Sequence, residues 1–134
     1  MKKEFSKHWV ASRQPRKQRK YKYNAPAHLR GGMISSHLGK SLRAEYKKRS
    51  VPLRKGDEVI VMRGEHRKKS GKVSRVDRKK YKVYVEGIKT KKVSGQEVEI
   101  PFDSSNLIIS KLILEDKERA RSLRRGKTST KTES

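Results

Sequence analysis

Apolar and polar residues alternate along three short runs between residues 54 and 87, and glycines and charged residues separate the runs. Successive side chains of a β-strand point to opposite faces, so this period of two predicts strands that each bury one face. The second run keeps the pattern only across a kink. One face of the predicted strands carries Val59 and Val61, Val73 and Val76, and Tyr81, Val83 and Val85, and the opposite face carries Glu58, Ile60, Met62, Lys82, Tyr84 and Glu86. We therefore expect a tightly curled β unit with cationic loops.

Two further patterns extend the β structure toward the C-terminus. Residues 88–100 form two short runs around Ser94 and Gly95, which predicts a hairpin that pairs a basic strand with an acidic one. Residues 107–114 are almost continuously apolar, and such a run is suited to the strand that closes a small sheet.

Two segments have helical features. Residues 35–49 place three apolar side chains at i, i+4 and i+8 on one stripe, with Ser35 or Ser36 as a cap and a stop before Pro52. That stripe consists of Leu38, Leu42 and Tyr46. From residue 115 onward acids precede arginines and Gly126 follows, which matches the helix dipole and a glycine C-cap.

The high content of charged residues limits how much of the chain can fold around one hydrophobic core. The 134 residues carry a net charge of +24, with 31% hydrophobic and 39% charged residues, so one core cannot extend over the whole length. Residues 1–30 show no apolar periodicity, and we expect them to be largely disordered until phosphates neutralise them. The predicted organisation is a basic arm and helix over 1–50, a β barrel with its hairpin over 51–114, and a helix with a polar tail over 115–134.

This charge requires a polyanionic partner, and nucleic acid is favoured over a membrane surface. No apolar run approaches the roughly 20 residues that span a bilayer, and no signal-peptide core follows the first lysines. Planar side chains within the basic arm can stack on unpaired bases, whereas a purely solubilising tail does not need them. They are Trp9, Tyr21, Tyr23 and His28. The chain has no cysteine, which suits a cytosolic protein.

Catalytic and metal chemistry have little support in the sequence. The four histidines are far apart and there is no cysteine, so a zinc site is not expected. Acids near the strand ends, such as Asp57 and Asp77, flank cations and fit charge balance better than general acid and base roles. Ser70-Gly71-Lys72 lacks the spacing of a phosphate-binding loop. We expect no enzyme activity and no cofactor.

One sequence motif resembles a known RNA-binding module. The run from Lys55-Gly56-Asp57 through Val61, Gly64, Gly71-Lys72-Val73 and Val76 resembles the KOW motif. The resemblance implies a mainly β fold, namely a small SH3-like barrel with a basic extended N-terminal arm, a short N-terminal helix and a C-terminal helix.

The flanks resemble the family of the universal ribosomal large-subunit protein twenty-four, called twenty-six in eukaryotes, in its archaeal and eukaryotic branch. The segments that carry this likeness include residues 24–30, Ser35-Ser36-His37-Leu38, Arg49-Ser50-Val51-Pro52, Tyr84-Val85-Glu86-Gly87, residues 105–112 and residues 116–119. The chain departs from the family at His66, where an aromatic is common, and at Lys68, where a second glycine is common.

The resemblance implies a structural ribosomal protein that binds large-subunit rRNA near the mouth of the nascent-chain exit tunnel and acts early in subunit assembly. The implied partners are large-subunit rRNA, neighbouring large-subunit ribosomal proteins and factors that dock at the tunnel exit. A KOW module of a transcription-elongation factor, which would bind polymerase, and a histone-like architectural DNA binder remain alternatives.

The residues predicted to contact RNA are cations and planar side chains of the arm, the short helix and the loops. Guanidinium groups bind phosphate bidentately, so arginines are preferred over lysines as phosphate ligands. The preferred arginines are Arg13, Arg16, Arg19, Arg30 and Arg43. The remaining predicted contacts are Lys17, Lys20, Tyr21, Lys22, His28, Lys40, Lys47, Arg49, Arg54, Lys55, Arg63, His66, Arg67, Lys68, Lys69, Lys72, Lys79, Lys80, Lys89, Lys91 and Lys92.

Overall fold

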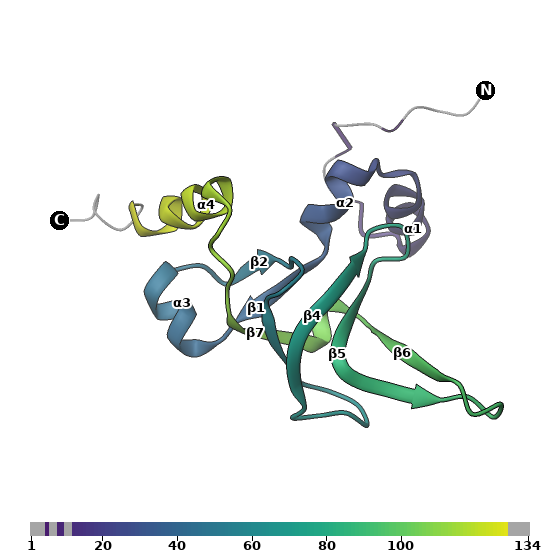
Figure 1. The fold of residues 1–134 in the computed structure, drawn as a ribbon. Coiled ribbons are helices and arrows are strands. Elements are labelled where there is room, and N and C mark those ends of the chain that lie inside the picture. The colour runs from purple at the N-terminus through teal and green to yellow at the C-terminus, as the bar shows by residue number, and fades with distance from the viewer. Residues whose placement is uncertain (1–4, 6–7, 10–11, 129–134) are drawn as a thin grey trace.

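The structure is a computed structural model in which residues 5, 8–9 and 12–128 are described. Seven strands form one strongly curled sheet in the order β2-β1-β7-β3-β4-β5-β6 (Figure 1). The strands are β1 Ser35–Leu38, β2 Ser50–Pro52, β3 Glu58–Val61, β4 Ser70–Asp77, β5 Lys82–Lys91, β6 Glu97–Phe102 and β7 Leu107–Lys111. The helices are α1 Pro15–Asn24, α2 Ala27–Met33, α3 Lys40–Tyr46 and α4 Lys117–Thr128, with a 3-10 turn at Ser104–Asn106. The expected mainly β fold with N-terminal and C-terminal helices is confirmed.

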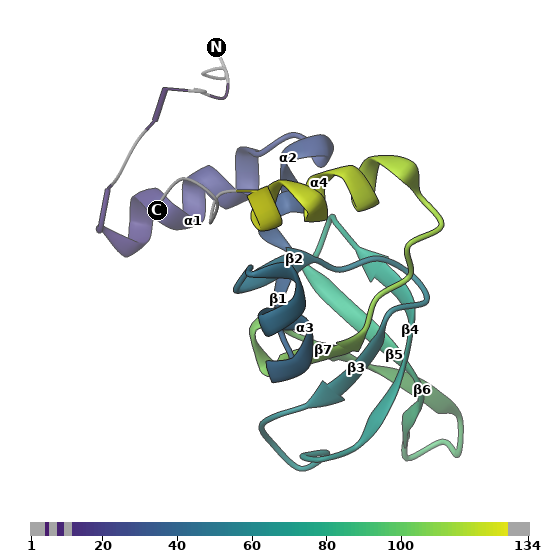
Figure 2. The same cartoon turned by 90° about the vertical axis from the view of Figure 1, so that its left-hand side faces the viewer.

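The helices lie at one end and along one side of the sheet. Figures 1 and 2 both place α1, α2 and α4 above the strands, whereas the β3–β4 loop and the tip of the β5–β6 hairpin point away from them. Strand β1 runs parallel to β7, and the other pairings are antiparallel. The β3–β4 loop and the hairpin tip therefore lie at the opposite end of this small barrel-like body from α1, α2 and α4.

Alternation along the central strands produces the core as predicted. Val59 and Val61 are buried on β3, whereas Ile60 between them is 37% exposed. The expected kink in β4 is a shift in strand register between Val73 and Arg75. Tyr84 lies on the face opposite Val83 and Val85 in the predicted pattern, and it is nevertheless only 8% exposed. The guanidinium of Arg75 lies 4.0 Å above the Tyr84 ring and covers that face.

The predicted hairpin is confirmed as β5 and β6, and its basic and acidic residues lie opposite one another as expected. Lys89 lies opposite Glu99, and Lys91 lies opposite Glu97. The Glu99 carboxylate nevertheless pairs with the Arg75 Nε at 3.3 Å. The closing strand β7 ends at Lys111, earlier than the expected 107–114.

The helix expected over 35–49 is wrong in its first part. Ser35–Leu38 form β1, and the Ser36 hydroxyl is buried and donates to the Ser104 carbonyl at 2.6 Å instead of capping a helix. Residues 37 and 38 pair with β7, and this long-range pairing overrides the local helical pattern. The helix that remains, α3, ends at Tyr46, and Lys47 follows as its C-cap with a positive φ of 53°.

The expectation that residues 1–30 are disordered is wrong for most of the described arm. Residues 15–24 and 27–33 are the helices α1 and α2, and Pro15 occupies the first turn of α1, where its missing N–H costs no bond. Tyr21 packs against Phe5 and Trp9, with ring centroids 4.8 and 4.6 Å apart. Local aromatic contacts supply order that apolar periodicity does not reveal.

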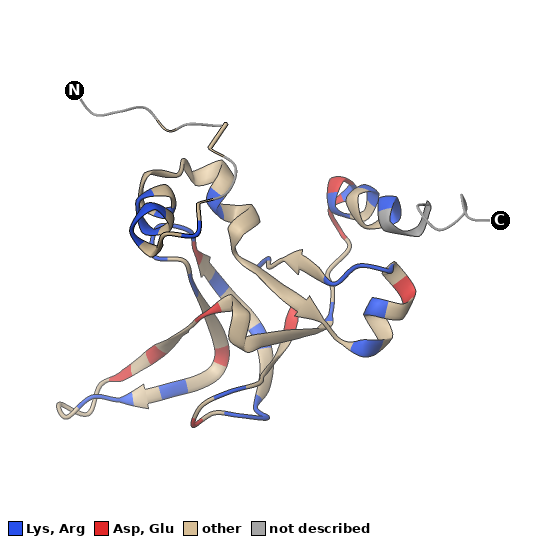
Figure 3. Ribbon diagram, turned by 180° about the vertical axis from the view of Figure 1, so that it is seen from behind, with Lys and Arg blue, Asp and Glu red and all other residues tan. Residues whose placement is uncertain are grey.

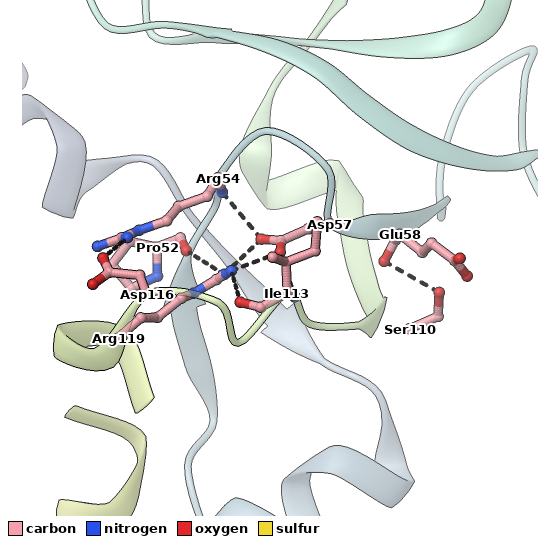
Figure 4. Close-up of polar contacts among 8 residues, drawn as sticks. All are labelled: Pro52, Arg54, Asp57, Glu58, Ser110, Ile113, Asp116 and Arg119. Carbon is pink, nitrogen blue, oxygen red and sulfur yellow. Dashed lines mark hydrogen bonds and ion pairs between the residues drawn. The ribbon is translucent and has the colours of Figure 1, made fainter. Parts of the chain in front are cut away.

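A buried ion pair attaches α4 to the sheet (Figure 4). The Asp57 carboxylate is fully buried and accepts hydrogen bonds from Arg119 Nη1 at 2.6 Å and Nη2 at 2.5 Å. It also accepts the backbone N–H groups of Arg54 at 3.0 Å and Ile113 at 3.1 Å. Arg119 Nη2 donates further to the Pro52 carbonyl at 3.1 Å. Asp57 therefore balances a positive charge, as the sequence indicated. That charge belongs to Arg119, which is distant in sequence and buried, and not to the cations that flank Asp57.

Helix α4 begins at Lys117, two residues after the start of the expected helical segment, and it ends beyond the expected Gly126. The Asp116 carboxylate accepts the Glu118 N–H at 3.0 Å, and the hydrogen bond from Arg54 lowers the pKa of Asp116 below its ordinary value. The glycine cap expected at Gly126 is wrong, because α4 continues to Thr128. Leu123 of this helix is 2% exposed and belongs to the core.

We expect Arg119→Met to destabilise the protein by about 3–5 kcal/mol, because it leaves the Asp57 carboxylate buried without a counter-charge. Urea unfolding followed by circular dichroism measures the free energy of unfolding. Arg121→Met is the matched control, since that side chain is 67% exposed and its loss should cost less than about 0.5 kcal/mol. Equal losses in the two variants would contradict the structural role of the pair.

We expect Gly71→Ala to destabilise by about 1–3 kcal/mol through overpacking. A Cβ at this position would lie 2.7 Å from the Glu86 carbonyl oxygen and 2.8 Å from a Val85 methyl carbon. Gly32→Ala is the control, because no atom lies within 4 Å of its added Cβ and helix propensity favours alanine by about 0.5–1 kcal/mol. The same urea unfolding measurement should show a loss of stability for Gly71→Ala and a gain for Gly32→Ala. An unchanged free energy of unfolding for Gly71→Ala would show that β4 and β5 can move apart to admit the methyl group without cost.

Candidate nucleic-acid interface

The structure distributes the predicted contact residues over several separate surfaces. Figure 3 shows Lys and Arg on α1, on α3 and α4, on the β3–β4 loop and on the β5–β6 hairpin. All predicted residues are exposed except Tyr21, Arg30 and His66, which are half-buried. Most of them can therefore reach a ligand, but they do not form one continuous site.

The arm docks on the turn between β4 and β5 through polar contacts. The Tyr81 hydroxyl donates to the Lys22 carbonyl, and Arg30 Nη1 donates to the Lys79 carbonyl at 3.1 Å. The Arg30 guanidinium also lies 5.2 Å from the Tyr81 ring centroid. Burial raises the pKa of the Tyr81 hydroxyl, and the positive charge of Arg30 opposes this shift. These contacts hold α1 beside the basic turn at residues 78–80.

Arg30 has its donors engaged within the protein. Besides its bond to Lys79, its Nε donates to the Ala25 carbonyl at 2.8 Å and its Nη2 donates to the Tyr23 carbonyl at 2.6 Å. Each guanidinium nitrogen thus binds a backbone carbonyl. The side chain that was a preferred phosphate ligand acts in this structure as a clamp for the arm.

The arm cluster consists of cations on α1 and on the adjoining turn. Its members are Arg16, Lys17, Arg19, Lys20 and Lys22 of α1, and Arg78, Lys79 and Lys80 of the turn. Helix α1 contains no acidic residue, so the cations at i, i+3 and i+4 repel one another. A polyanion that binds this face relieves that repulsion.

A cationic groove of about 660 Å³ lies between α2 and the strand region. Its lining includes the basic side chains of His28, Arg54, Lys55, Arg75 and Arg78, together with Gly31, Gly32, Pro52, Leu53 and Val76. Arg54 is paired with Asp116, and Arg75 is paired with Glu99. Lys55 and Arg78 have no carboxylate partner within the described part of the chain.

The sequence did not reveal this groove. Arg75 and Arg78 were not among the predicted contacts, although Arg78 begins the basic run at residues 78–80. Gly31 of α2 was the available signal, because glycine is unfavourable inside a helix and can mark a place where another group approaches the backbone closely. The Arg78 guanidinium lies 3.5 Å from the position that a Cβ of Gly31 would take.

The β3–β4 loop is a hydrogen-bonded turn that presents exposed cations. The backbone N–H of Lys68 donates to the Val61 carbonyl at 2.8 Å, and that of Lys69 donates to the His66 carbonyl at 3.1 Å. Lys68 has a positive φ of 71°, a backbone conformation that glycine adopts more readily than lysine. The His66 ring meets Phe102 edge to face, with centroids 6.1 Å apart. Arg63, Arg67, Lys68 and Lys69 remain exposed.

The other cations lie on the hairpin, on β4 and around α3. Lys89 and Lys91 face acidic positions across the hairpin, so their charge is partly compensated. Lys72 is exposed on β4. Lys40, Arg43, Lys47 and Arg49 are exposed on and after α3, which contacts α4. These surfaces are separate from the arm cluster.

The described residues offer no arrangement for metal binding or for crossing a membrane. No three His, Cys, Asp or Glu side chains within residues 5, 8–9 and 12–128 are grouped to hold a metal ion. No helix in that part of the chain is both long and apolar enough to traverse a bilayer. What the geometry provides is a rigid body with several cationic surfaces.

Comparison with known proteins finds relatives over most of the chain. The family model for the eukaryotic ribosomal proteins L26 and their archaeal L24 counterparts matches residues 12–126. The large ribosomal subunit protein uL24 of Korarchaeum cryptofilum (strain OPF8) is 48% identical over 116 residues, which cover 87% of this chain and 88% of the relative. The proteins of the same name from Methanospirillum hungatei JF-1 and Methanosphaera stadtmanae are 46% and 44% identical over 114 residues, covering 85% of this chain and 95% and 97% of theirs. The chain therefore belongs to the family of eukaryotic L26 and archaeal L24 ribosomal proteins.

Proposed function

We propose that this protein binds large-subunit rRNA through its cationic surfaces, near the mouth of the nascent-chain exit tunnel and early in subunit assembly. As a member of a ribosomal-protein family, it is a structural constituent of the cytoplasmic ribosome and not an enzyme. Its further partners in this proposal are neighbouring large-subunit proteins and factors that dock at the tunnel exit.

The observation that carries the proposal is the arm cluster held rigidly beside the cationic groove. The arm cluster is attached to the sheet through Arg30 and Tyr81. In the groove, Lys55 and Arg78 have no carboxylate partner within the described residues. Phosphate contacts supply most of the affinity of such proteins. The deep groove of A-form RNA hides its base edges, so selectivity comes from shape and from unpaired bases. A rigid array of cations can match the phosphate positions of one folded RNA.

The cations divide into two groups in this proposal. Arg30 and Arg119 hold the protein together, and the exposed cations of the arm cluster, the groove and the loops contact phosphate. If about six to ten of them bind at once, affinity should fall about 10³- to 10⁵-fold between 50 and 200 mM salt, by analogy with duplex DNA.

An architectural DNA binder or a KOW module of a transcription-elongation factor is the second candidate function. A protein of either kind could have the same cationic barrel, but an architectural DNA binder would prefer duplex DNA and a transcription-elongation module would associate with polymerase. Competition between duplex DNA and structured rRNA separates the two candidates, because preference for the duplex contradicts the ribosomal proposal.

We expect the exposed α1 cations to make a defined set of phosphate contacts. Substituting Arg16, Lys17, Arg19 and Lys20 by glutamine keeps helix propensity and should reduce the salt slope of rRNA binding by about 0.7–0.9 for each lost contact. Filter binding at several salt concentrations measures the slope. A control with the same charge change carries Lys111, Lys117, Arg121 and Arg124 as glutamine. Equal effects would mean that only net charge matters and that the arm has no special role.

We expect a negative charge placed in the groove to weaken rRNA binding. Gly32→Glu has open space for its side chain and should reduce affinity about fivefold, since one close charge contributes about 1 kcal/mol in a solvated site. Gly32→Gln has nearly the same shape without the charge, and Gly32→Ala tests the backbone change. Affinity should remain near that of the unaltered protein in both. Equal binding by the Glu and Gln variants would exclude the groove as a phosphate site.

A further inference from the structure

A second cleft, distinct from the cationic groove, lies beside the first turns of α1. It has a volume of about 380 Å³, which is within the range of about 300–1,000 Å³ typical of small-ligand sites. Its walls come from the chain before α1, from α1 itself and from the last residue of α2. They are Trp9, Ser12, Arg13, Gln18, Tyr21, Lys22 and Met33.

One wall of the cleft is aromatic. The Trp9 and Tyr21 rings are stacked, with centroids 4.6 Å apart and an angle of 21° between their planes. Phe5 also packs against Tyr21, at 4.8 Å. Met33 adds a flexible apolar side chain to the lining. The wall is thus a platform of the kind on which nucleic-acid bases stack, held in place by its own aromatic contacts.

The rim of the cleft is polar and positively charged. Arg13 and Lys22 are exposed and form no ion pair within the described residues. The Gln18 Nε2 donates to the Ser12 carbonyl at 3.1 Å, which fixes the amide and leaves its oxygen to accept a hydrogen bond. An apolar peptide would use the platform but would not need two cations, whereas a nucleotide uses all of these features.

We propose that this cleft holds one unstacked base of a single-stranded RNA segment. The base stacks on the aromatic wall, its edge donates to the Gln18 oxygen, and Arg13 and Lys22 bind the flanking phosphates. This inference rests on the proposed rRNA binding and adds the class of nucleotide that the arm recognises: an unpaired base in a loop, bulge or strand end.

Trp9 is the single tryptophan of the chain, so intrinsic fluorescence reports on this cleft directly. The full-length protein is titrated at fixed salt with large-subunit rRNA, with an unstructured single-stranded RNA and with an RNA duplex of equal phosphate number. We expect the rRNA and the single strand to quench tryptophan emission. The duplex should bind through phosphates with little quenching, because its bases are already stacked.

Two substitutions at Trp9 separate stacking from folding. Trp9→Leu should weaken binding of the single strand by about 5- to 100-fold, the loss of one stacked base, and Trp9→Phe should retain most of the affinity. Leu114→Ala is the control for loss of an exposed apolar side chain outside the arm, because Leu114 is 44% exposed and belongs to none of the proposed RNA-binding surfaces, so affinity should remain unchanged. Filter binding measures all three variants, including the tryptophan-free ones.

The outcomes distinguish this inference from the function on which it rests. Tight rRNA binding without quenching, together with an unchanged Trp9→Leu variant, overturns the cleft as a base site and leaves rRNA binding intact. Trp9 emission that changes when the protein is assembled into subunits, but not when it binds protein-free rRNA, means that a neighbouring protein fills the cleft. That result also overturns the inference. Absence of any preference for large-subunit rRNA overturns the proposed function and this inference with it.

Discussion

The pairing of one buried carboxylate with one buried arginine connects the parts of this small protein. Asp57 lies in the turn before β3 and accepts hydrogen bonds from Arg54, Ile113 and Arg119, which belong to three different segments. Arg119 in turn reaches the Pro52 carbonyl at the end of β2. Breaking a buried pair of this kind is expensive, because the remaining charge stays out of water. The position of α4 and the exit of the chain from β7 therefore depend on a polar contact as much as on apolar packing.

Polar contacts also attach the N-terminal arm to the sheet. Ala25 is the one buried residue within residues 15–33, which form the helices α1 and α2 and the link between them, so apolar burial alone does little to hold them. The clamp formed by Arg30 and the hydroxyl of Tyr81 fixes them to the β4–β5 turn instead. Polar attachment leaves nearly every cation of α1 exposed. A chain with so little apolar sequence can in this way be ordered and still present most of its charge to a polyanion.

Two kinds of surface then lie on one arm. The groove beside α2 offers cations to phosphates, and the cleft beside α1 offers an aromatic platform with a charged rim. Figure 3 shows that the β3–β4 loop and the hairpin carry their cations at the far end of the molecule. A rigid sheet between these surfaces sets their spacing. Folded RNA is recognised by shape and by exposed bases, and such spacing is what shape recognition requires.

The sequence by itself determined the sheet of valines, the hairpin, the helical C-terminus and the strong excess of positive charge, because period-two burial and unbalanced charge are local properties. Tertiary structure decided the rest. Ser36 lies in a strand because β7 pairs beside it, and Tyr84 is buried because Arg75 covers it. Whether an arginine clamps a carbonyl, as Arg30 does, or faces solvent, as Arg16 does, depends on which distant backbone and acidic groups the fold brings near it. Residue type and local spacing carry no record of those neighbours, so only the folded chain separates structural cations from those available to RNA.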